Sequence, residues 1–559
     1  MDRAMDHAVE HSGAERIVDA LTWQSAVRSD LRVAESLLSG ASPDGVYGIS
    51  HSRIVDHFLF FVEELGVGEA LRGLQPVGVK RKGIPGELYT ALYFLRCLAR
   101  IPSQEALPDL LFSDTALMLR LGFNAHQIEM GITQRSAARR KGPRTNAPVD
   151  PEAISKNVAK LDLDAVRALV TLALKALWAA HPVVSPKGLF VIDGSFVEPG
   201  ESTEGTGKTS RSKAVFTTEG MKTIKTWIIG FKIVWLWSVE TGLPVAIGFG
   251  TAERDERAFV PDLLKQAKEV LADRCTIGTV LLDRGFLDGP DLWALNEAGI
   301  RFVIPARHDL KVYEEAHRAV DNEVPTHILH RQSRTRAVRH RPEGGRGKLV
   351  TEQHTTEAVG MEGCTTFTTY APADDVDRSE HKHRYRRDFV PPKINAVVLT
   401  REDGRKNVDL TLLTNGAVSR PLAAFDDYDE RSRIENQGHR DLKQFWHLER
   451  PPQRNAKVAE IHAYFVLLAY GLTQGYRAWL DAQVRAEDAG KPQSLGGYVR
   501  QIEAENKDKL LIFVGDAYGI FYSCEFSMLL GRPVRQPNLK AAPNIDALME
   551  RLRATKPKG

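Results

Sequence analysis

Two short apolar runs near the middle of the chain each end on an aspartate that is closely followed by a glycine. The first reads Val191-Ile192-Asp193-Gly194, and the second reads Leu281-Leu282-Asp283-Arg284-Gly285. Short runs rich in Val, Ile and Leu that end in turn residues predict buried strands. Such strands need cover from other elements, so the two runs constrain the chain to a sheet with helices against its faces.

More of the central sequence follows this pattern. Further strand-like runs, rich in Val, Ile, Phe and Trp, cover residues 226–239, 244–248 and 301–304. Helical periodicity separates the later runs, over residues 256–272 and 289–298. Three strands followed by alternating helices and strands predict an α/β fold with a mixed sheet. This order and spacing match an RNase H-like core, in which Asp193 leaves the first strand and Asp283 leaves the fourth.

The rest of the chain divides by pattern into segments around this core. Apolar residues recur every three or four positions over residues 52–65, 87–99 and 163–180, which predicts helices. After Val320 the periodicity is lost, and Thr- and Val-containing runs with glycine-rich turns predict a β-rich insertion. The predicted segments are 1–185 (helical), 186–308 (first part of the core), 309–393 (β-rich insertion), 394–450 (second part of the core) and 451–559 (helical).

A third acidic residue, Glu435, belongs to a helix predicted in the second part of the core. This helix is expected to start near Asp426 or Asp427, either of which can cap it, and to end near His447. Tyr428 and Arg431 precede Glu435 by seven and four positions, so the three side chains share one face of a regular helix. Any one of these features alone is typical of a turn or of a solvated, salt-bridged helix face.

Together, two carboxylates at strand ends and a third on a later helix suit a metal site that cuts phosphodiesters. Such chemistry uses two Mg²⁺ ions roughly 3.5–4 Å apart, which clamp the attacking and leaving oxygens. Mg²⁺ prefers carboxylate oxygen and water, and clustered carboxylates without a cation repel one another. We therefore expect Asp193, Asp283 and Glu435 to converge as catalytic and metal-binding residues, with Mn²⁺ able to replace Mg²⁺.

This combination resembles the DDE transposases of bacterial insertion sequences, specifically the cut-and-paste group with a Tyr-x2-Arg-x3-Glu-x6-Lys signature. The resemblance implies that Asp193, Asp283 and Glu435 form the catalytic triad and that Tyr428, Arg431 and Lys443 contact transposon-end DNA. It implies a DNA-binding N-terminal region and a homodimer that bridges two inverted repeats on double-stranded DNA. It also implies metal-dependent nicking, followed by strand transfer into target DNA.

The chain departs from this signature at two positions. Seven residues, not six, separate Glu435 from Lys443, which displaces Lys443 by about 100° on a regular helix. A one-residue bulge near Gly438 would restore Lys443, or Arg440 would take its place. Ser432 stands where a related transposase carries a tryptophan that holds a flipped base, so another aromatic such as Trp237 would have to stack on DNA.

The net charge of +3 is close to neutral, so the whole-chain charge does not by itself indicate a DNA partner. Local basic clusters support the prediction of DNA binding instead. Arg139, Arg140, Lys141 and Arg144 form one cluster that can grip phosphates, and a solvated linker is the alternative interpretation. A second basic run extends from Arg331 to Lys348. His439, on the predicted helix, could position water or phosphate, although a packing role is the more ordinary interpretation.

Other bulk features limit where such a protein would work. The four cysteines are scattered and form no C-x-x-C pair, which argues against a zinc site and favours reduced thiols. The first ten residues are polar and charged, unlike a secretory signal, and no apolar stretch is long enough to span a membrane. We therefore expect a cytoplasmic protein with no membrane partner, and the resemblance to bacterial transposases implies association with the nucleoid.

Three alternative interpretations stay open at the level of sequence. A catalytically silent descendant would bind transposon ends without cutting them. Another RNase H-like endonuclease, such as a resolvase or repair enzyme, would share the core but prefer a different DNA substrate. A carbohydrate hydrolase with paired carboxylates fits less well, because it explains neither the third acidic position nor the basic clusters.

Overall fold

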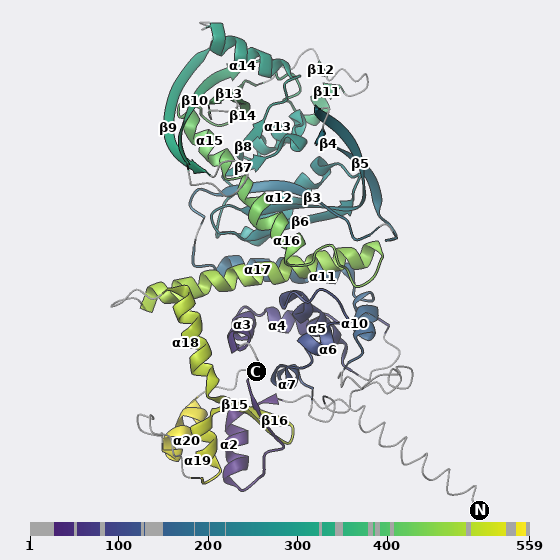
Figure 1. The fold of residues 1–559 in the computed structure, drawn as a ribbon, viewed down its shortest axis with the longest axis vertical. Coiled ribbons are helices and arrows are strands. Elements are labelled where there is room, and N and C mark those ends of the chain that lie inside the picture. The colour runs from purple at the N-terminus through teal and green to yellow at the C-terminus, as the bar shows by residue number, and fades with distance from the viewer. Residues whose placement is uncertain are drawn as a thin grey trace, which may run out of the picture. The chain divides into compact units, whose positions relative to one another are not determined.

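The chain is divided by its internal contacts into two compact units, labelled by element in Figure 1. Unit 1 holds residues 1–182 and 446–559, and unit 2 holds residues 183–445. The five segments drawn from the sequence stay a prediction. The computed structural model describes residues 27–49, 53–78, 84–123, 128, 149–183, 185–200, 202–217, 220–322, 327–340, 350–377, 384–385, 392–402, 407–487, 494–532 and 544–554.

Unit 2 is built on one large mixed sheet. Its strands are β3 (Leu189–Val197), β4 (Gly207–Thr217), β5 (Gly220–Ser238), β6 (Pro244–Thr251), β7 (Thr279–Leu282), β8 (Arg301–Pro305), β9 (Ile328–His340), β10 (Val350–Cys364), β13 (Ile394–Glu402) and β14 (Asn407–Thr414). Among the described residues their order is β4-β5-β3-β7-β8-β14-β13-β10-β9, and β6 pairs with β5. The insertion strands β9 and β10 therefore extend the same sheet through β13.

The parallel strands β3, β7 and β8 lie at the centre of this order. Val191, Leu281 and Val303, one from each strand, are fully buried, as expected where a central strand is covered on both faces. Each run that the sequence predicts as a strand in residues 188–304 lies in a strand, so the mixed α/β architecture is confirmed for this part. The pairing of Ile192 with Leu282 brings the end of β7 beside the middle of β3. Since β3 continues to Val197, the expectation that Asp193 leaves the first strand was wrong.

Helices connect the central strands and follow them. The helical elements of unit 2 are η1 (Glu256–Phe259), α12 (Val260–Leu271), η2 (Arg284–Phe286), α13 (Gly289–Glu297), α14 (Lys311–Asn322), η3 (Ala373–Asp375), α15 (Pro421–Asp429), η4 (Ile434–His439) and α16 (Arg440–Gln444). Two short strands, β11 (Val376–Asp377) and β12 (Arg384–Tyr385), pair with each other. Parallel strands need such crossover connections, which η1 and α12 provide before β7 and α13 provides before β8.

The helix predicted to carry Glu435 is divided into three pieces. It begins at Pro421, earlier than the expected Asp426 or Asp427, and α15 ends at Asp429. After a turn, η4 is a π-helical turn, and α16 ends at Gln444 rather than near His447. A π-helical turn accommodates one extra residue, so the structure has the bulge near Gly438 that was one of the two possibilities considered. Arg431 contacts both the Tyr428 ring and the Glu435 carboxylate, so these three side chains lie near one another despite the break in the helix.

Unit 1 combines helices from both ends of the chain. They are α2 (Asp30–Leu38), α3 (Arg53–Glu64), α4 (Val67–Gly73), α5 (Gly86–Leu98), α6 (Leu107–Leu110), α7 (Thr115–Arg120), α10 (Pro151–Val158), α11 (Leu163–Ala180), α17 (Ala456–Glu487), α18 (Leu495–Lys507), α19 (Ser523–Leu529) and α20 (Ile545–Ala554). The long helix α17 packs along α11 and α5. None of the described helices has both the length and the apolar character that crossing a membrane requires.

Unit 1 also contains a small sheet that the helical prediction for both chain ends missed. Within the described part of the chain its order is β1 (Val27–Arg28), β16 (Ala517–Tyr522), β15 (Lys509–Val514) and β2 (Gly45–Gly48). β1 pairs with β16, and β2 pairs with β15, so the sheet joins the two chain ends. It shares a core with α2, α19 and α20, in which Val33, Ile512 and Leu548 are buried.

Candidate active site

Asp193 lies within β3, and its side chain is only 8% exposed. Its Oδ2 atom faces two cationic or polar groups from the segment after α15. Arg431 Nη1 lies 3.5 Å away, and His439 Nε2 lies 3.4 Å away. A buried carboxylate at a central strand is rigidly held, which suits a residue that must present its oxygens in a fixed direction.

Asp283 follows β7 directly and caps the short helix η2. Its carboxylate accepts a hydrogen bond from the backbone N–H of Gly285. Burial raises the pKa of Asp283, the Gly285 hydrogen bond acts against that rise, and the negative charge of Asp193 adds to it. The carboxyl groups of Asp193, within β3, and of Asp283, directly after β7, therefore sense one another, as the parallel pairing of these strands predicts.

Glu435 is held by Arg431 rather than by solvent alone. Arg431 Nη2 lies 2.5 Å from Glu435 Oε1. The other terminal nitrogen of Arg431, Nη1, is buried and makes no hydrogen bond, although it lies near Asp193. The guanidinium thus lies between Asp193 and Glu435, and Asp283 also senses its charge. Of the three carboxylates expected to form a triad, Asp193 on β3 and Glu435 on η4 lie within ion-pair distance of one arginine, and Asp283, which follows β7, senses its charge.

Tyr428 and His439 line the same region. The Arg431 guanidinium lies 5.9 Å from the centroid of the Tyr428 ring, and burial raises the pKa of the Tyr428 hydroxyl. The indole N–H of Trp235 donates to His439 Nε2 at 3.2 Å, and both residues are buried. This hydrogen bond supports the packing interpretation of His439, because an acceptor nitrogen carries no proton to donate.

Sequence reasoning missed a fourth carboxylate, Glu256, at the first position of η1. A Cβ atom built on Gly194 would lie 3.0 Å from Glu256 Oε1, and one built on Gly285 would lie 3.1 Å from Glu256 Oε2. Burial raises the pKa of Glu256, Lys232 lowers it, and the charges of Asp283 and Asp193 raise it further. Glutamate is common in the first turn of any helix, so its position in the sequence gave no functional signal.

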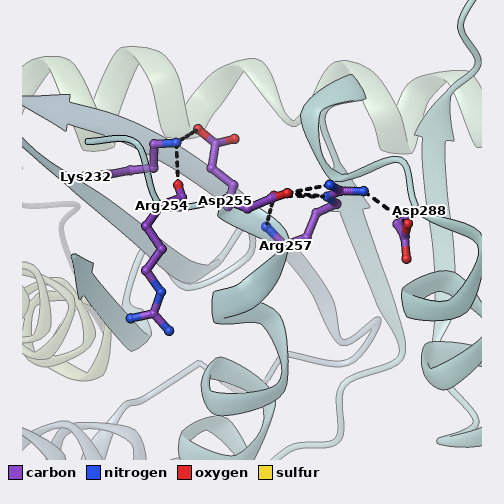
Figure 2. Close-up of polar contacts among 6 residues, drawn as sticks. Lys232, Arg254, Asp255, Arg257 and Asp288 are labelled. Atoms are coloured by element: carbon purple, nitrogen blue, oxygen red, sulfur yellow. Dashed lines mark hydrogen bonds and ion pairs between the residues drawn. The ribbon is translucent and has the colours of Figure 1, made fainter. Parts of the chain in front are cut away.

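Lys232 approaches this carboxylate from β5. Its Nζ atom lies 3.3 Å from Glu256 Oε1 and donates to the carbonyl oxygen of Arg254 at 2.9 Å, as Figure 2 shows for Lys232 and Arg254. The side chain of Lys232 is 10% exposed and that of Glu256 is 23% exposed. The pairing of these two largely buried groups offsets part of the free-energy cost of taking them out of water.

The backbone around Glu256 is anchored by a second network, also drawn in Figure 2. Arg257 pairs with Asp255, and its Nη1 atom donates to Asp288 at 3.0 Å. The Asp255 carboxylate also accepts from the backbone N–H of Arg257 at 3.0 Å and so caps η1. Since Asp288 precedes α13, this network ties the start of η1 to the segment that follows Asp283.

The donor set fits a hard divalent cation in its chemistry. Asp193, Asp283, Glu435 and Glu256 offer carboxylate oxygens, which Mg²⁺ and Mn²⁺ prefer. Gly194 and Gly285 leave open the space that their Cβ atoms would fill beside these oxygens. Within the residues that the structure describes, no three His, Cys, Asp or Glu side chains lie close enough to hold a metal as they stand. Glu435 is instead paired with Arg431, which also lies 3.5 Å from Asp193.

The remaining residues expected to contact DNA lie at several places. Arg440 is exposed and Lys443 half-buried, both on α16. Arg139, Arg140, Lys141 and Arg144 fall outside the described residues.

Trp237 was suggested as a stacking residue, and this was wrong: its side chain is buried, and its N–H donates to the carbonyl of Gly242. Ser432 is exposed and hydrogen-bonds the carbonyl of Asp429.

The comparison with known families agrees with the position of this site. The family model described as "Transposase DDE domain" matches residues 185–472, which is just over half of the chain and includes all four carboxylates. No curated protein matches the chain.

Proposed function

The chain belongs to the transposase DDE domain family, and from this premise we propose that it cuts and rejoins DNA at the ends of an insertion sequence. The family implies DNA binding and divalent-metal-dependent hydrolysis or transesterification of phosphodiesters. The proposal adds an RNase H-like core of the Tyr-Arg-Glu-Lys group and a cut-and-paste route. It further adds a homodimer that bridges two terminal inverted repeats, acting in the bacterial cytoplasm.

The observation that carries the proposal is the set of three carboxylates around Arg431. Asp193 and Glu435 both lie within ion-pair distance of this guanidinium, and the charge of Asp283 acts on the same group. These residues come from two adjacent strands and from the π-helical turn that follows α15. Carboxylates that face one cation have the charge and the ligand type that a divalent metal site needs.

In the proposed reaction Asp193, Asp283 and Glu435 hold Mg²⁺, or Mn²⁺ in its place. Held there, such cations would supply Lewis-acid activation of the attacking water or 3′-hydroxyl and would stabilise charge on the leaving oxygen. Arg431 forks onto phosphate oxygens of the strand to be cut, beside Tyr428, and in doing so releases Glu435. Arg440 and Lys443 on α16 bind the backbone of the transposon end, and the cluster Arg139, Arg140, Lys141 and Arg144 grips the terminal repeat.

Asp193→Ala provides the direct test. The full-length protein is incubated with DNA that carries the ends flanking its own gene, with and without Mg²⁺, and nicks and joined products are separated on a sequencing gel. We expect Mg²⁺-dependent nicking by the wild type and its loss in Asp193→Ala. The exposed Asp262 on α12 supplies a matched control, and Asp262→Ala should nick like the wild type.

Two results would overturn the proposal. Cleavage without a divalent metal, or full nicking by Asp193→Ala, would remove the carboxylates from the reaction. A wild type that binds the ends specifically but never nicks them would support the catalytically silent alternative instead. Nicking without preference for the inverted repeats or strand transfer would favour a general endonuclease.

A further inference from the structure

Resting on the function proposed above, we propose that Glu256 is a fourth carboxylate of the metal site, held in place by Lys232. The known family match assigns no role to this residue, and the sequence pattern does not single it out. The position of the Glu256 carboxylate is defined by Gly194, which follows Asp193, and by Gly285, which lies two residues after Asp283.

The geometry places Glu256 beside Gly194 within β3 and beside Gly285 after β7. One of its oxygens faces Gly194, the residue after Asp193, and the other faces Gly285, two residues after Asp283. A Cβ on Gly285 would lie 2.9 Å from Asp283 Oδ1 and 3.1 Å from Glu256 Oε2, so these two carboxylates border one small space. A cation near that space would have oxygens from both residues within reach.

A structural role as the counter-ion of Lys232 does not account for this position. The Lys232 ammonium already donates to the Arg254 carbonyl at 2.9 Å, a shorter contact than its 3.3 Å approach to Glu256. The contact with Lys232 uses Oε1, whereas Oε2 is the oxygen that faces Gly285 and Asp283. Lys232 therefore orients the carboxylate and leaves one oxygen directed toward the site.

The charges of the site point the same way. In the structure Arg431 lies within ion-pair distance of Asp193 and Glu435, and Lys232 lies within ion-pair distance of Glu256. When Arg431 turns to a DNA phosphate, as proposed above, it no longer neutralises Asp193 and Glu435. Gathered carboxylates repel one another, so binding of divalent metal would then lower the electrostatic free energy of the site.

Binding of Mn²⁺ alone tests the assignment without relying on activity. Titration of Mn²⁺ into the full-length protein, followed by electron paramagnetic resonance or calorimetry, compares wild type, Glu256→Gln, Glu256→Asp and Asp193→Asn. We expect Glu256→Gln to weaken Mn²⁺ binding by about 10- to 100-fold, as loss of a carboxylate near a metal does. Glu256→Asp keeps the charge but shortens the reach, and a smaller loss is expected.

Matched variants separate this role from a structural one. Glu269→Gln removes the same charge from the exposed face of α12 and should bind Mn²⁺ like the wild type. A higher Mn²⁺ concentration should restore nicking to Glu256→Gln, because the defect is one of metal affinity. Thermal unfolding without metal checks that each variant is folded. If Glu256→Gln does not fold, the Mn²⁺ titration of Glu256→Asp decides whether Glu256 binds the metal.

The outcomes distinguish the two proposals. Wild-type Mn²⁺ affinity in both Glu256 variants, together with a loss in Asp193→Asn, overturns the role of Glu256 and leaves the proposed function intact. Unchanged affinity in Asp193→Asn as well overturns the metal site itself. If Glu256→Gln and Glu269→Gln weaken Mn²⁺ binding equally, the loss comes from the overall charge of the protein. That result would also overturn the assignment of Glu256.

Discussion

At the scale of single residues, Gly438 decides how the turn that carries Glu435 lies on the sheet. A Cβ atom at this position would lie 2.5 Å from Cζ2 of Trp235 and 3.0 Å from its Cη2. Trp235 is fully buried in β5, and its N–H is committed to His439. The absence of a side chain at Gly438 therefore lets η4 approach β5 closely enough for Arg431 to reach Asp193.

Gly438→Ala should consequently destabilise unit 2. Overpacking against a buried tryptophan costs about 1–3 kcal/mol in the free energy of unfolding, which urea unfolding can measure. Gly496→Ala is the control, because the nearest atom to its Cβ would be Arg500 Nη1 at 4.0 Å. Gly496 lies in α18, so alanine there should be neutral or stabilising by about 0.5–1 kcal/mol. Equal stability of the two variants would contradict the packing argument.

At the scale of elements, side chains that the sequence groups together serve different purposes. Arg334 belongs to the basic run that was considered for phosphate contacts. In the structure it donates two hydrogen bonds to Asp426, at 2.8 and 2.7 Å, and these hydrogen bonds lower the pKa of the Asp426 carboxyl. Arg334 therefore ties β9 to α15, the helix that leads to Tyr428. An arginine engaged in this way is a structural link and not a free phosphate ligand.

The paired strands β4 and β5 carry a better candidate for DNA contact. Trp227 is 59% exposed, and the ammonium groups of Lys208 and Lys225 lie 4.5 and 5.3 Å from its ring centroid. An exposed aromatic between cations combines a stacking surface with phosphate attraction. If the chain binds DNA as proposed, this hairpin supplies the stacking group that the buried Trp237 cannot.

Trp227→Ala should therefore weaken binding to transposon-end DNA by about 1–3 kcal/mol, the range measured for lost base stacking. Fluorescence anisotropy with labelled DNA provides the measurement. Trp227→Phe keeps a ring and should retain most of the affinity. Leu172→Ala removes another exposed apolar side chain, 47% exposed, from unit 1 and serves as the control. Unaltered affinity in Trp227→Ala would exclude stacking at this residue.

At the scale of the whole molecule, the stability of unit 1 depends on contacts between distant parts of the sequence. His462 on α17 is buried between Tyr93 on α5 and the backbone of His447. Its Nε2 must donate to the His447 carbonyl, so its Nδ1 accepts from the Tyr93 hydroxyl at 2.8 Å. These bonds hold the neutral imidazole, and burial lowers the pKa of His462 to about 3.

This histidine makes the stability of unit 1 depend on pH. An unfolded chain takes up a proton at His462 near its ordinary pKa of about 6.5, whereas the folded protein resists protonation until a much lower pH. The stabilising effect is complete above about pH 6.5 and is lost as the pH falls toward the folded pKa, by up to about 1.4 kcal/mol per pH unit.

Urea unfolding between about pH 7 and about pH 4 tests this linkage. His462→Gln should be less stable than the wild type at neutral pH, since a buried network is broken, yet its stability should fall less steeply with acid. His308→Gln changes an exposed histidine of unit 2 and is the matched control. A wild-type slope in His462→Gln would show that other groups control the acid sensitivity.

Local sequence pattern by itself determined the central strands and the residues at their ends. The runs ending at Asp193 and Asp283 are apolar, short and closed by glycine, so their hydrophobic periodicity alone predicts buried strands in an α/β core. The order of strand, strand and helix pointed to Glu435 as the third acidic residue, and its catalytic role stays a prediction. The irregularity near Gly438 was one of two possibilities, raised because the spacing to Lys443 exceeds that of the signature the chain resembles by a single residue.

Tertiary structure alone decided which groups surround those carboxylates. Arg431 holds Glu435 away from the aspartates, Glu256 reaches the glycines beside them, and Trp237 lies buried instead of facing a ligand. The sheet that joins the two chain ends was equally invisible to sequence pattern. Periodicity reports which face of an element is buried, but the partner on that face depends on register and packing between residues that are hundreds of positions apart.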